Sequence, residues 1–516
     1  MSSPDNAAAL HLPKRYTWTV VALFWLAAAM LALGVCPYYR FNPDSALYTG
    51  IARSLARGEG YTFSGAPQAS IPPVVPYYLS LACRLARFVE PGAPFLSTFI
   101  YFNAFTAAAA MAGYIIAFFL LYEWGGARRG LTAFALLVLC HKYFAFGIEP
   151  MTEAMYCALS WAALLYLARV EKEPMRGRRI LAAVLLPLSV MTRVAGVTLA
   201  AAVAALWAWR YLFSREVRAT AAANLGMVFP SIAAAAAFFI NMSTSRGGGA
   251  FNYIDDVSTG RNFHEIALRM AANLAGLPAY VFETITNLES IAGIGLILAA
   301  VVALGAWRMW REGMKLPAVY TVLYVLFVGA CYEVKPRYIV PLLPMVFLWT
   351  IAGFSYLLSV LRPAARKHAG RVLRVLAALV IAANLFEIGR AIRLNYSADF
   401  YANLRHGAYV DYISLARRLL KDPPQGRIMA RQMRIIYALT ELPTAWLPYH
   451  PDASYRPSPA DTARYVEQMG ITTLVTDTED KVDEKIFTDF VGSDPAWRRT
   501  AKVGRLTLYE KEPPPQ

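Results

Sequence analysis

Three carboxylates stand where apolar segments of the chain begin or end, and such groups can move protons. Asp44 lies in the stretch Asn42–Gly60, directly after the first long apolar segment, and Glu149 and Glu153 flank the start of a later one. Ionisable residues at the edge of a membrane are candidates for function. A carboxylate there can accept the proton of an attacking hydroxyl group. We predict that Asp44 is the catalytic acid/base, and that a second carboxylate positions an acceptor or shares a divalent metal ion.

Three cations occupy comparable positions. Arg193 lies between two closely spaced apolar segments, and Lys335 and Arg337 share a short turn before another. If the substrate is a sugar joined to a lipid phosphate, such cations would stabilise the negative charge that develops on the departing phosphate. These three residues are therefore predicted to bind the donor phosphate.

Each of these residues also has a purely structural interpretation. Asp44 could only cap a helix, and the two glutamates could do the same, because a helix N-terminus favours acids. Lys335 and Arg337 could extend to lipid headgroups, and Arg193 could pair with either glutamate. No single residue decides between the two interpretations, but their predicted placement on the same side, with Asp44 in a large external loop, favours a functional role for the set.

His264 completes the set of candidates. It lies in a predicted external loop near Asp255 and Asp256. Together with Glu149 it is a candidate metal ligand. The structural alternative is a histidine exposed in a loop.

The composition indicates a membrane protein with some soluble mass. Of the 516 residues, 57% are hydrophobic and 16% charged, whereas soluble domains carry about 25% charged residues. A bilayer crossing needs roughly 20 apolar residues. The candidate spans are Tyr16–Cys36, Pro94–Tyr122, Gly130–Phe146, Met151–Ala168, Ile180–Met191, Ala195–Phe213, Thr220–Asn241, Ser290–Trp310, Leu316–Tyr332, Tyr338–Leu361 and Val372–Arg390, about eleven helices.

The distribution of charge predicts the topology. The net charge of +16 does not indicate nucleic-acid binding, because Lys and Arg cluster in short loops between apolar segments. Basic loops face the cytoplasm, which places residues 37–93, 242–289 and those after about 394 outside. Within the first external loop, Asn42–Gly60 and Val74–Glu90 carry apolar residues on one face and are predicted to be interfacial helices.

The chain divides into a predicted transmembrane domain, 1–393, and a soluble extracytoplasmic domain, 394–516. Alternating helical and strand patterns in the second predict a small α/β fold. The expected elements are helices Tyr412–Leu420, Pro459–Met469 and Asp483–Val491, strands Arg427–Ala430 and Ile471–Thr476, and an edge strand Arg505–Tyr509. This domain has no nucleotide, metal or nucleophile motif, so we expect a scaffold, lid or acceptor-binding role. The five cysteines leave a Cys36–Cys83 disulfide open.

Several of these stretches together resemble the integral-membrane glycosyltransferases of the C fold (GT-C). The nearest branch holds the protein O-mannosyltransferases and the lipid A aminoarabinose transferase. Over roughly residues 16–361, the matching pieces are Pro43–Tyr48 with Ala52-Arg53 and Gly58–Gly60, Pro72-Pro73, Thr152-Glu153, Thr192-Arg193, and Arg337-Tyr338 with Pro341 and Pro344.

The resemblance implies a sugar donor on polyprenyl or dolichyl phosphate, inverting transfer outside the membrane and often a divalent metal ion. It makes Asp44 the catalytic carboxylate and Glu153 the second acid. Two departures, Ser45 in place of a second acid and Ser70-Ile71 in place of a lysine, do not support lipid A as the acceptor.

The sequence therefore predicts an α-helical polytopic glycosyltransferase of the bacterial inner membrane. It would move a sugar from polyprenyl phosphate to an extracytoplasmic glycan, lipid or protein. One alternative is a transporter or flippase for lipid-linked sugars, although the paired halves and broken helices of transporters are not evident. The other is a non-catalytic assembly protein of the cell envelope.

Overall fold

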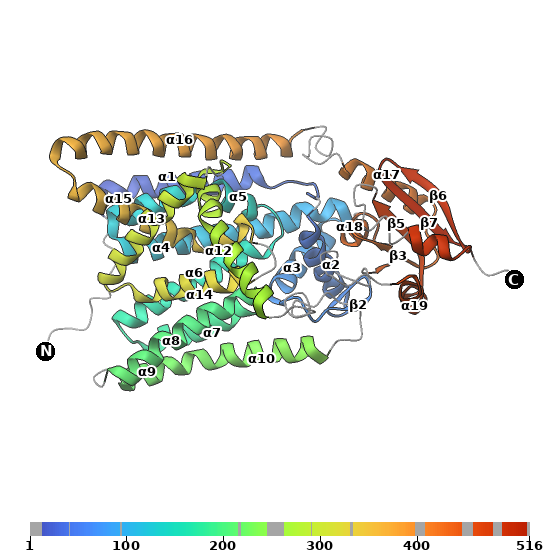
Figure 1. Ribbon diagram of the computed structural model, residues 1–516, viewed down its shortest axis with the longest axis horizontal. Coiled ribbons are helices and arrows are strands. Elements are labelled where there is room, and N and C mark those ends of the chain that lie inside the picture. The colour runs from blue at the N-terminus through green and yellow to red at the C-terminus, as the bar shows by residue number, and fades with distance from the viewer. Residues whose placement is uncertain are drawn as a thin grey trace.

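The molecule is elongated, with a helical bundle at one end and a β-sheet at the other (Figure 1). The computed structural model describes residues 13–40, 42–92, 95–214, 218–244, 263–289, 292–330, 334–397, 408–445, 458–477 and 488–512. Helices α2 (Pro43–Arg57) and α3 (Val74–Val89) lie between the bundle and the sheet. We call this end of the bundle the domain end.

The bundle is that of a multi-pass membrane protein. In the described part of the chain, seven helical segments are long and apolar enough to cross a membrane, and a bent pair makes up to eight. The seven are α1 (Lys14–Gly34), α4 (Phe99–Val138), η2 with α8 (Val194–Phe213), α9 to α10 (Arg218–Thr244), α13 (Ala292–Arg311), η5 with α15 (Pro336–Val360) and α16 (Pro363–Asn395). The bent pair is α5 (His141–Gly147) and α6 (Thr152–Lys172), at 110°. The shorter α7 (Arg176–Val190) and α14 (Lys315–Ala330) also belong to the bundle.

Two predicted spans, Pro94–Tyr122 and Gly130–Phe146, form the arms of a hairpin in α4. The chain leaves helical geometry at Gly126, where φ is 66° and ψ is −174°. Glycine adopts this backbone conformation readily, because it has no Cβ. The arms then pack against each other, with the rings of Phe118 and Phe134 5.4 Å apart. The second arm ends earlier than predicted, and α5 is a separate helix.

The predicted external loop Met242–Glu289 contains a helix instead, which corrects the prediction. Within the described residues, α12 (Phe263–Thr286) packs against α13, α14, α16 and η5. The sequence of α12 mixes polar and apolar residues and contains Pro278, so it has no continuous apolar run that would predict a span.

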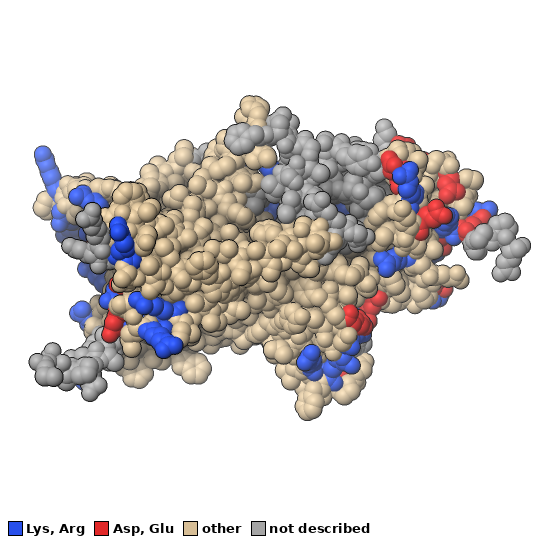
Figure 2. Space-filling view, turned by 90° about the horizontal axis from the view of Figure 1, so that it is seen from below, with Lys and Arg blue, Asp and Glu red and all other residues tan. Residues whose placement is uncertain are grey.

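Charged side chains are distributed unequally along the molecule (Figure 2). Lys and Arg gather at the end of the bundle far from the sheet, the middle is almost free of charge on the face shown, and both signs mix near the sheet. The uncharged belt is the part that a bilayer would cover.

α2 begins with a cap that is not Asp44. The Asn42 side chain accepts a hydrogen bond from the Asp44 N–H at 3.0 Å, and Pro43 occupies the first helical position, where its missing N–H costs nothing. Gly58 ends the helix in the left-handed conformation, with φ of 80°. The interpretation that the Asp44 side chain caps α2 is therefore wrong, because Asn42 supplies the cap. The Asp44 carboxylate can make other contacts.

The C-terminal region forms a mixed five-stranded sheet in the order β4-β3-β5-β7-β6. Strands β3, β4 and β5 are parallel, and β7 runs antiparallel to β5 and β6. The elements are α17 (Ala408–Lys421), β3 (Arg427–Ala430), α18 (Met433–Thr440), β4 (Thr444–Ala445), α19 (Pro459–Met469), β5 (Ile471–Asp477), β6 (Trp497–Val503) and β7 (Leu506–Lys511).

This sheet confirms the α/β prediction with corrections. The predicted edge strand Arg505–Tyr509 is β7, which lies inside the sheet because β6 covers it. Elements α18, β4 and β6 were not predicted. Residues 483–487 of the predicted helix Asp483–Val491 lie outside the described residues. The structure describes residues 488–493, and they are helical.

One hydrophobic core joins the C-terminal region to α2 and α3. Its buried residues include Leu47 and Ile51 of α2, Leu79 and Cys83 of α3, Leu415 of α17, Ile436 of α18, Val475 of β5 and Leu508 of β7. The predicted boundary at residue 394 therefore separates sequence segments that share a core. Cys36 and Cys83 are both buried free thiols, so the disulfide left open by the sequence is not formed.

Candidate active site

The carboxylate of Asp44 is held by two guanidinium groups at the domain end. Its Oδ2 accepts a hydrogen bond from Arg337 Nη1 at 2.8 Å, and its Oδ1 accepts one from Arg434 Nη1 at 2.8 Å. Burial alone would raise the pKa of Asp44, but the charges of Arg434, Arg337 and Arg193 outweigh it and hold the pKa below its usual value. Asp44 is therefore ionised and oriented through both oxygens.

Glu153 and Arg193 form a second ion pair in the same region. Arg193 Nη1 lies 3.0 Å from Glu153 Oε1, and the side chains are 13% and 1% exposed. Glu153 stands in the first turn of α6. The alternative that Arg193 pairs with a glutamate is thus confirmed.

Tyr338 lies between the two pairs. Its ring is in cation–π range of both cations, with guanidinium carbons 5.0 Å (Arg193) and 5.2 Å (Arg337) from the centroid. Arg337 Nη2 also lies 3.4 Å from the Tyr338 hydroxyl. The two arginines therefore share one aromatic surface, which places both predicted phosphate ligands side by side.

Glu149 lies in the bend between α5 and α6, outside both helices. Burial raises the pKa of Glu149 to about 7, against the attraction of Arg40 and a hydrogen bond from Asn42, while Glu153 and Asp44 raise it further. Glu149 can therefore gain or lose a proton near neutral pH.

Two predicted residues lie apart from this centre. Lys335 is exposed at the start of η5, two positions before Arg337. His264 is exposed in the first turn of α12, and its predicted neighbours Asp255 and Asp256 lie outside the described residues. The described residues include no group of three or more His, Cys, Asp or Glu side chains arranged for a metal. The arrangement does not fit a metal ion, because Asp44 and Glu153 are both engaged by arginines.

Sequence reasoning missed Arg434. It comes from α18 in the C-terminal region, for which no chemical role was predicted. The only signal was the apolar run that follows it, Ile435-Ile436-Tyr437-Ala438-Leu439, which indicates a buried helix but gives no direction for the arginine.

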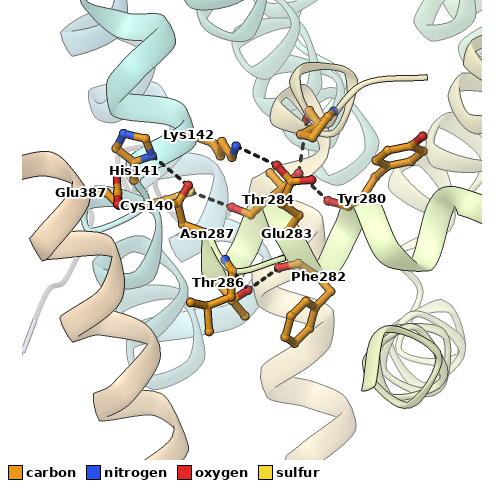
Figure 3. A network of polar contacts seen from close by, with 12 residues as sticks. Cys140, His141, Lys142, Tyr280, Phe282, Glu283, Thr284, Thr286, Asn287 and Glu387 are labelled. Carbon is orange, nitrogen blue, oxygen red and sulfur yellow. Dashed lines mark hydrogen bonds and ion pairs between the residues drawn. The ribbon is translucent and has the colours of Figure 1, made fainter. Parts of the chain in front are cut away.

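A polar network supports η5, the segment that carries Arg337 (Figure 3). Thr284 donates to the Pro336 carbonyl oxygen at 3.3 Å, and Lys142 pairs with Glu283 at 3.0 Å. His141 Nδ1 lies 3.1 Å from Asn287 Oδ1. These contacts tie α5 and α12 to the residue before Arg337.

The turn that carries Arg193 is held in a similar way. The Val74 N–H at the start of α3 donates to the Met191 carbonyl oxygen at 3.0 Å. A Cβ at Gly196 would lie 2.5 Å from the Ser189 carbonyl oxygen, so this close turn requires glycine.

Solved structures show which fold this is. Sequence comparison finds no matching family model and no matching curated protein. The aminoarabinose transferase ArnT from Cupriavidus metallidurans in the apo state matches with a TM-score of 0.62 at 12% identity, over 96% of this chain and 98% of that one. The structure of ArnT bound to undecaprenyl phosphate matches with a TM-score of 0.61 at 13% identity, again over 96% of this chain and 98% of that one.

A second solved structure has a similar fold, but the match covers a smaller share of that protein's chain. The archaeal oligosaccharyltransferase AglB from Archaeoglobus fulgidus, with an inhibitory peptide and dolichol-phosphate, matches with a TM-score of 0.56 at 12% identity. The match covers 96% of this chain and 74% of that one. The predicted fold is confirmed: the chain has the GT-C fold of integral-membrane glycosyltransferases.

Proposed function

We propose that this protein is a membrane glycosyltransferase that moves a sugar from a polyprenyl-phosphate donor to an acceptor outside the cytoplasm, with inversion. One observation carries the proposal: Asp44, freed from capping by Asn42, lies in a cluster of arginines at the domain end. The fold supports it, since the solved relatives include a complex with undecaprenyl phosphate.

The reaction assigns a role to each charged group. The acceptor hydroxyl oxygen attacks the anomeric carbon, the bond from that carbon to the phosphate oxygen breaks, and the hydroxyl proton passes to Asp44. The leaving polyprenyl phosphate takes the bonding electrons. Arg337 and Arg193 would stabilise the charge on that phosphate.

Binding of the donor would also prepare the base. Both oxygens of Asp44 accept from arginines in the present structure. The phosphodiester of the donor carries one negative charge, as a carboxylate does, and its two unesterified oxygens can compete with Asp44 for Arg337. Its arrival would release Oδ2, which could then receive the acceptor proton.

Glu153 has a positioning role in this proposal. Its pairing with Arg193 holds that guanidinium against Tyr338. No step passes through a metal ion or His264, because the described side chains do not fit a metal site.

The orientation follows from charge. The end rich in Lys and Arg would face the cytoplasm. The site and the C-terminal region would then face the periplasm from the inner membrane. The acceptor would be a glycan, lipid or protein of the cell envelope.

The test is sugar transfer in reconstituted membranes. Purified protein in nanodiscs receives radiolabelled hexoses and pentoses on undecaprenyl phosphate, with envelope membranes from a strain that lacks the gene as acceptor. We expect label in the acceptor fraction and release of undecaprenyl phosphate, both lost in Asp44→Asn. Undiminished transfer by that variant would overturn the assignment.

The same samples separate the alternatives. A flippase would move the labelled lipid between leaflets of a vesicle without releasing undecaprenyl phosphate. A non-catalytic assembly protein would do neither. Circular dichroism and gel filtration of Asp44→Asn check that the variant is folded.

A further inference from the structure

Helix α18 is tied to α2 by charge at both of its ends. At its start, Arg434 bonds Asp44 at the start of α2, at 2.8 Å. At its end, Glu441 pairs with Arg53 and with Arg57, the latter at 3.6 Å, near the end of α2. The two helices therefore run side by side in the same direction, with complementary charges in register.

The packing between these pairs is close. The ring of Tyr437 on α18 lies 4.6 Å from that of Phe63. A Cβ at Gly50 of α2 would lie 2.6 Å from Phe63 and 3.1 Å from Tyr437. Thr444, just beyond α18, donates its N–H to Ser64 Oγ at 2.7 Å. Arg434 is therefore presented by a docked helix and not by a loose loop.

The two arginines on Asp44 come from different parts of the molecule. Arg337 belongs to η5, at the start of a segment that can cross the membrane. Arg434 belongs to the C-terminal region, and its side chain is 17% exposed. A donor phosphate anchored by a lipid chain arrives from the membrane, so it meets the bundle's cations before Arg434.

We propose that Arg434 is a positioning residue for the catalytic carboxylate. It keeps Oδ1 of Asp44 throughout the reaction, while Arg337 transfers to the donor phosphate and leaves Oδ2 facing the acceptor. The C-terminal region is then part of the active site. This inference rests on the proposed function, because it gives Arg434 a place in that reaction.

The surroundings of Asp44 define what removal of Arg434 would do. The other cations that act on Asp44 are Arg337 and Arg193, and Arg193 is already paired with Glu153. The acid that interacts with Asp44 is Glu149. Loss of Arg434 removes one of the two guanidinium groups that bond the carboxylate, so its protonation should become easier.

The experiment measures protonation of Asp44 without any substrate. Full-length protein in nanodiscs is treated with a carbodiimide and glycine ethyl ester at a series of pH values. Mass spectrometry of the Asp44 peptide gives labelling against pH, because the protonated carboxyl reacts. We expect the midpoint to rise by about one pH unit in Arg434→Gln and to stay near wild type in Arg434→Lys.

Glu441→Gln is the matched control. It removes both ion pairs that join the end of α18 to α2. In Glu441→Gln we expect the pH midpoint of Asp44 labelling to stay at the wild-type value, even if the unfolding temperature of the variant falls. Equal midpoint shifts in Arg434→Gln and Glu441→Gln would mean that Arg434 only docks α18, which overturns the proposal.

Binding of undecaprenyl phosphate supplies the second readout. Arg434→Gln should bind this lipid as wild type does, whereas Arg337→Gln should bind it at least tenfold more weakly. Equal losses would assign Arg434 to the phosphate and overturn the positioning role. Failure of Asp44→Asn to affect sugar transfer would overturn the proposed function separately, since the labelling midpoints do not depend on transfer.

Discussion

Asp44 and Arg337 are 293 positions apart in the chain, yet their side chains meet at 2.8 Å. The contact joins α2, which lies between the bundle and the sheet, to the beginning of a segment long and apolar enough to cross a membrane. Asp44 and Arg337 are therefore brought together by the packing of distant segments and not by local sequence.

Removing the guanidinium of Arg337 should weaken lipid phosphate binding. A hydrogen bond to a charged group contributes about 1.5–3 kcal/mol, so we expect Arg337→Gln to bind undecaprenyl phosphate roughly 10- to 100-fold more weakly. The measurement is a titration in nanodiscs. Arg308→Gln is the control, because Arg308 lies in the last turn of α13 and pairs with Glu312 at 3.1 Å on the surface. Equal affinities for the two variants would contradict the phosphate role.

Glu153→Gln should destabilise the bundle. Glu153 is 1% exposed and neutralises Arg193, and removing one partner of a buried ion pair costs about 3–5 kcal/mol. We expect a clear fall in the unfolding temperature, measured by nano-differential scanning fluorimetry. The double variant with Arg193→Gln should recover part of the loss, since no unpaired charge remains. If the double variant is less stable than either single variant, an unpaired buried charge is not the cause of the lost stability.

Glu149→Gln should change how stability depends on pH. The folded-state pKa of Glu149 is about 7, above the ordinary value of 4.5. The acid form therefore favours folding, and that contribution is lost as the pH rises from about 4.5 through 7. Glutamine resembles the neutral acid, so the variant should gain a few degrees of unfolding temperature at pH 8. It should gain almost nothing at pH 4.5, and the opposite trend would contradict the raised pKa.

Gly50→Ala should disturb the docking of α18. A Cβ there would lie 2.6 Å from Phe63, and overpacking of this kind costs about 1–3 kcal/mol. We expect lower stability and reduced sugar transfer. Gly389→Ala is the control, because a Cβ at that position of α16 has no neighbour within 4 Å. Alanine should be neutral or stabilising there.

Cysteine labelling tests the orientation. Arg176 is exposed at the start of α7 and Glu467 is exposed on α19, whereas the four described cysteines are buried. An impermeant maleimide added to intact spheroplasts should label Glu467→Cys. It should label Arg176→Cys only after the membrane is opened. The reverse pattern would place the Asp44 site on the cytoplasmic side.

The local pattern of the sequence was sufficient for much of the fold. Apolar runs of the required length located most of the helices, and the spacing of Leu47, Ile51 and Leu55 located α2. α12 was missed because it mixes polar and apolar residues and has no single apolar run, although it packs against α13, α14, α16 and η5. Tertiary packing, which the sequence pattern does not record, decided its structure.

The candidate site was predictable only in part. Asp44, Glu153, Arg193 and Arg337 were identified from their positions at the ends of apolar segments, and the structure brings them together. Their pairing was not predictable, because it depends on which helices meet. For Arg434 the apolar run that follows it indicated a buried helix but not the role of the arginine, which comes from the way α18 packs on α2.

The shared core of α2, α3 and the C-terminal sheet has a consequence for the order of assembly. Asp44 leaves the ribosome 390 residues before Arg434, so α2 is without this partner until α18 is translated. Chain synthesis at about 5–20 residues per second makes this wait roughly 20–80 seconds. During that time the apolar face that later meets α18 is uncovered. The Asp44–Arg434 contact therefore forms only after α18 has been synthesised, and nascent chains that stop after α16 would lack it.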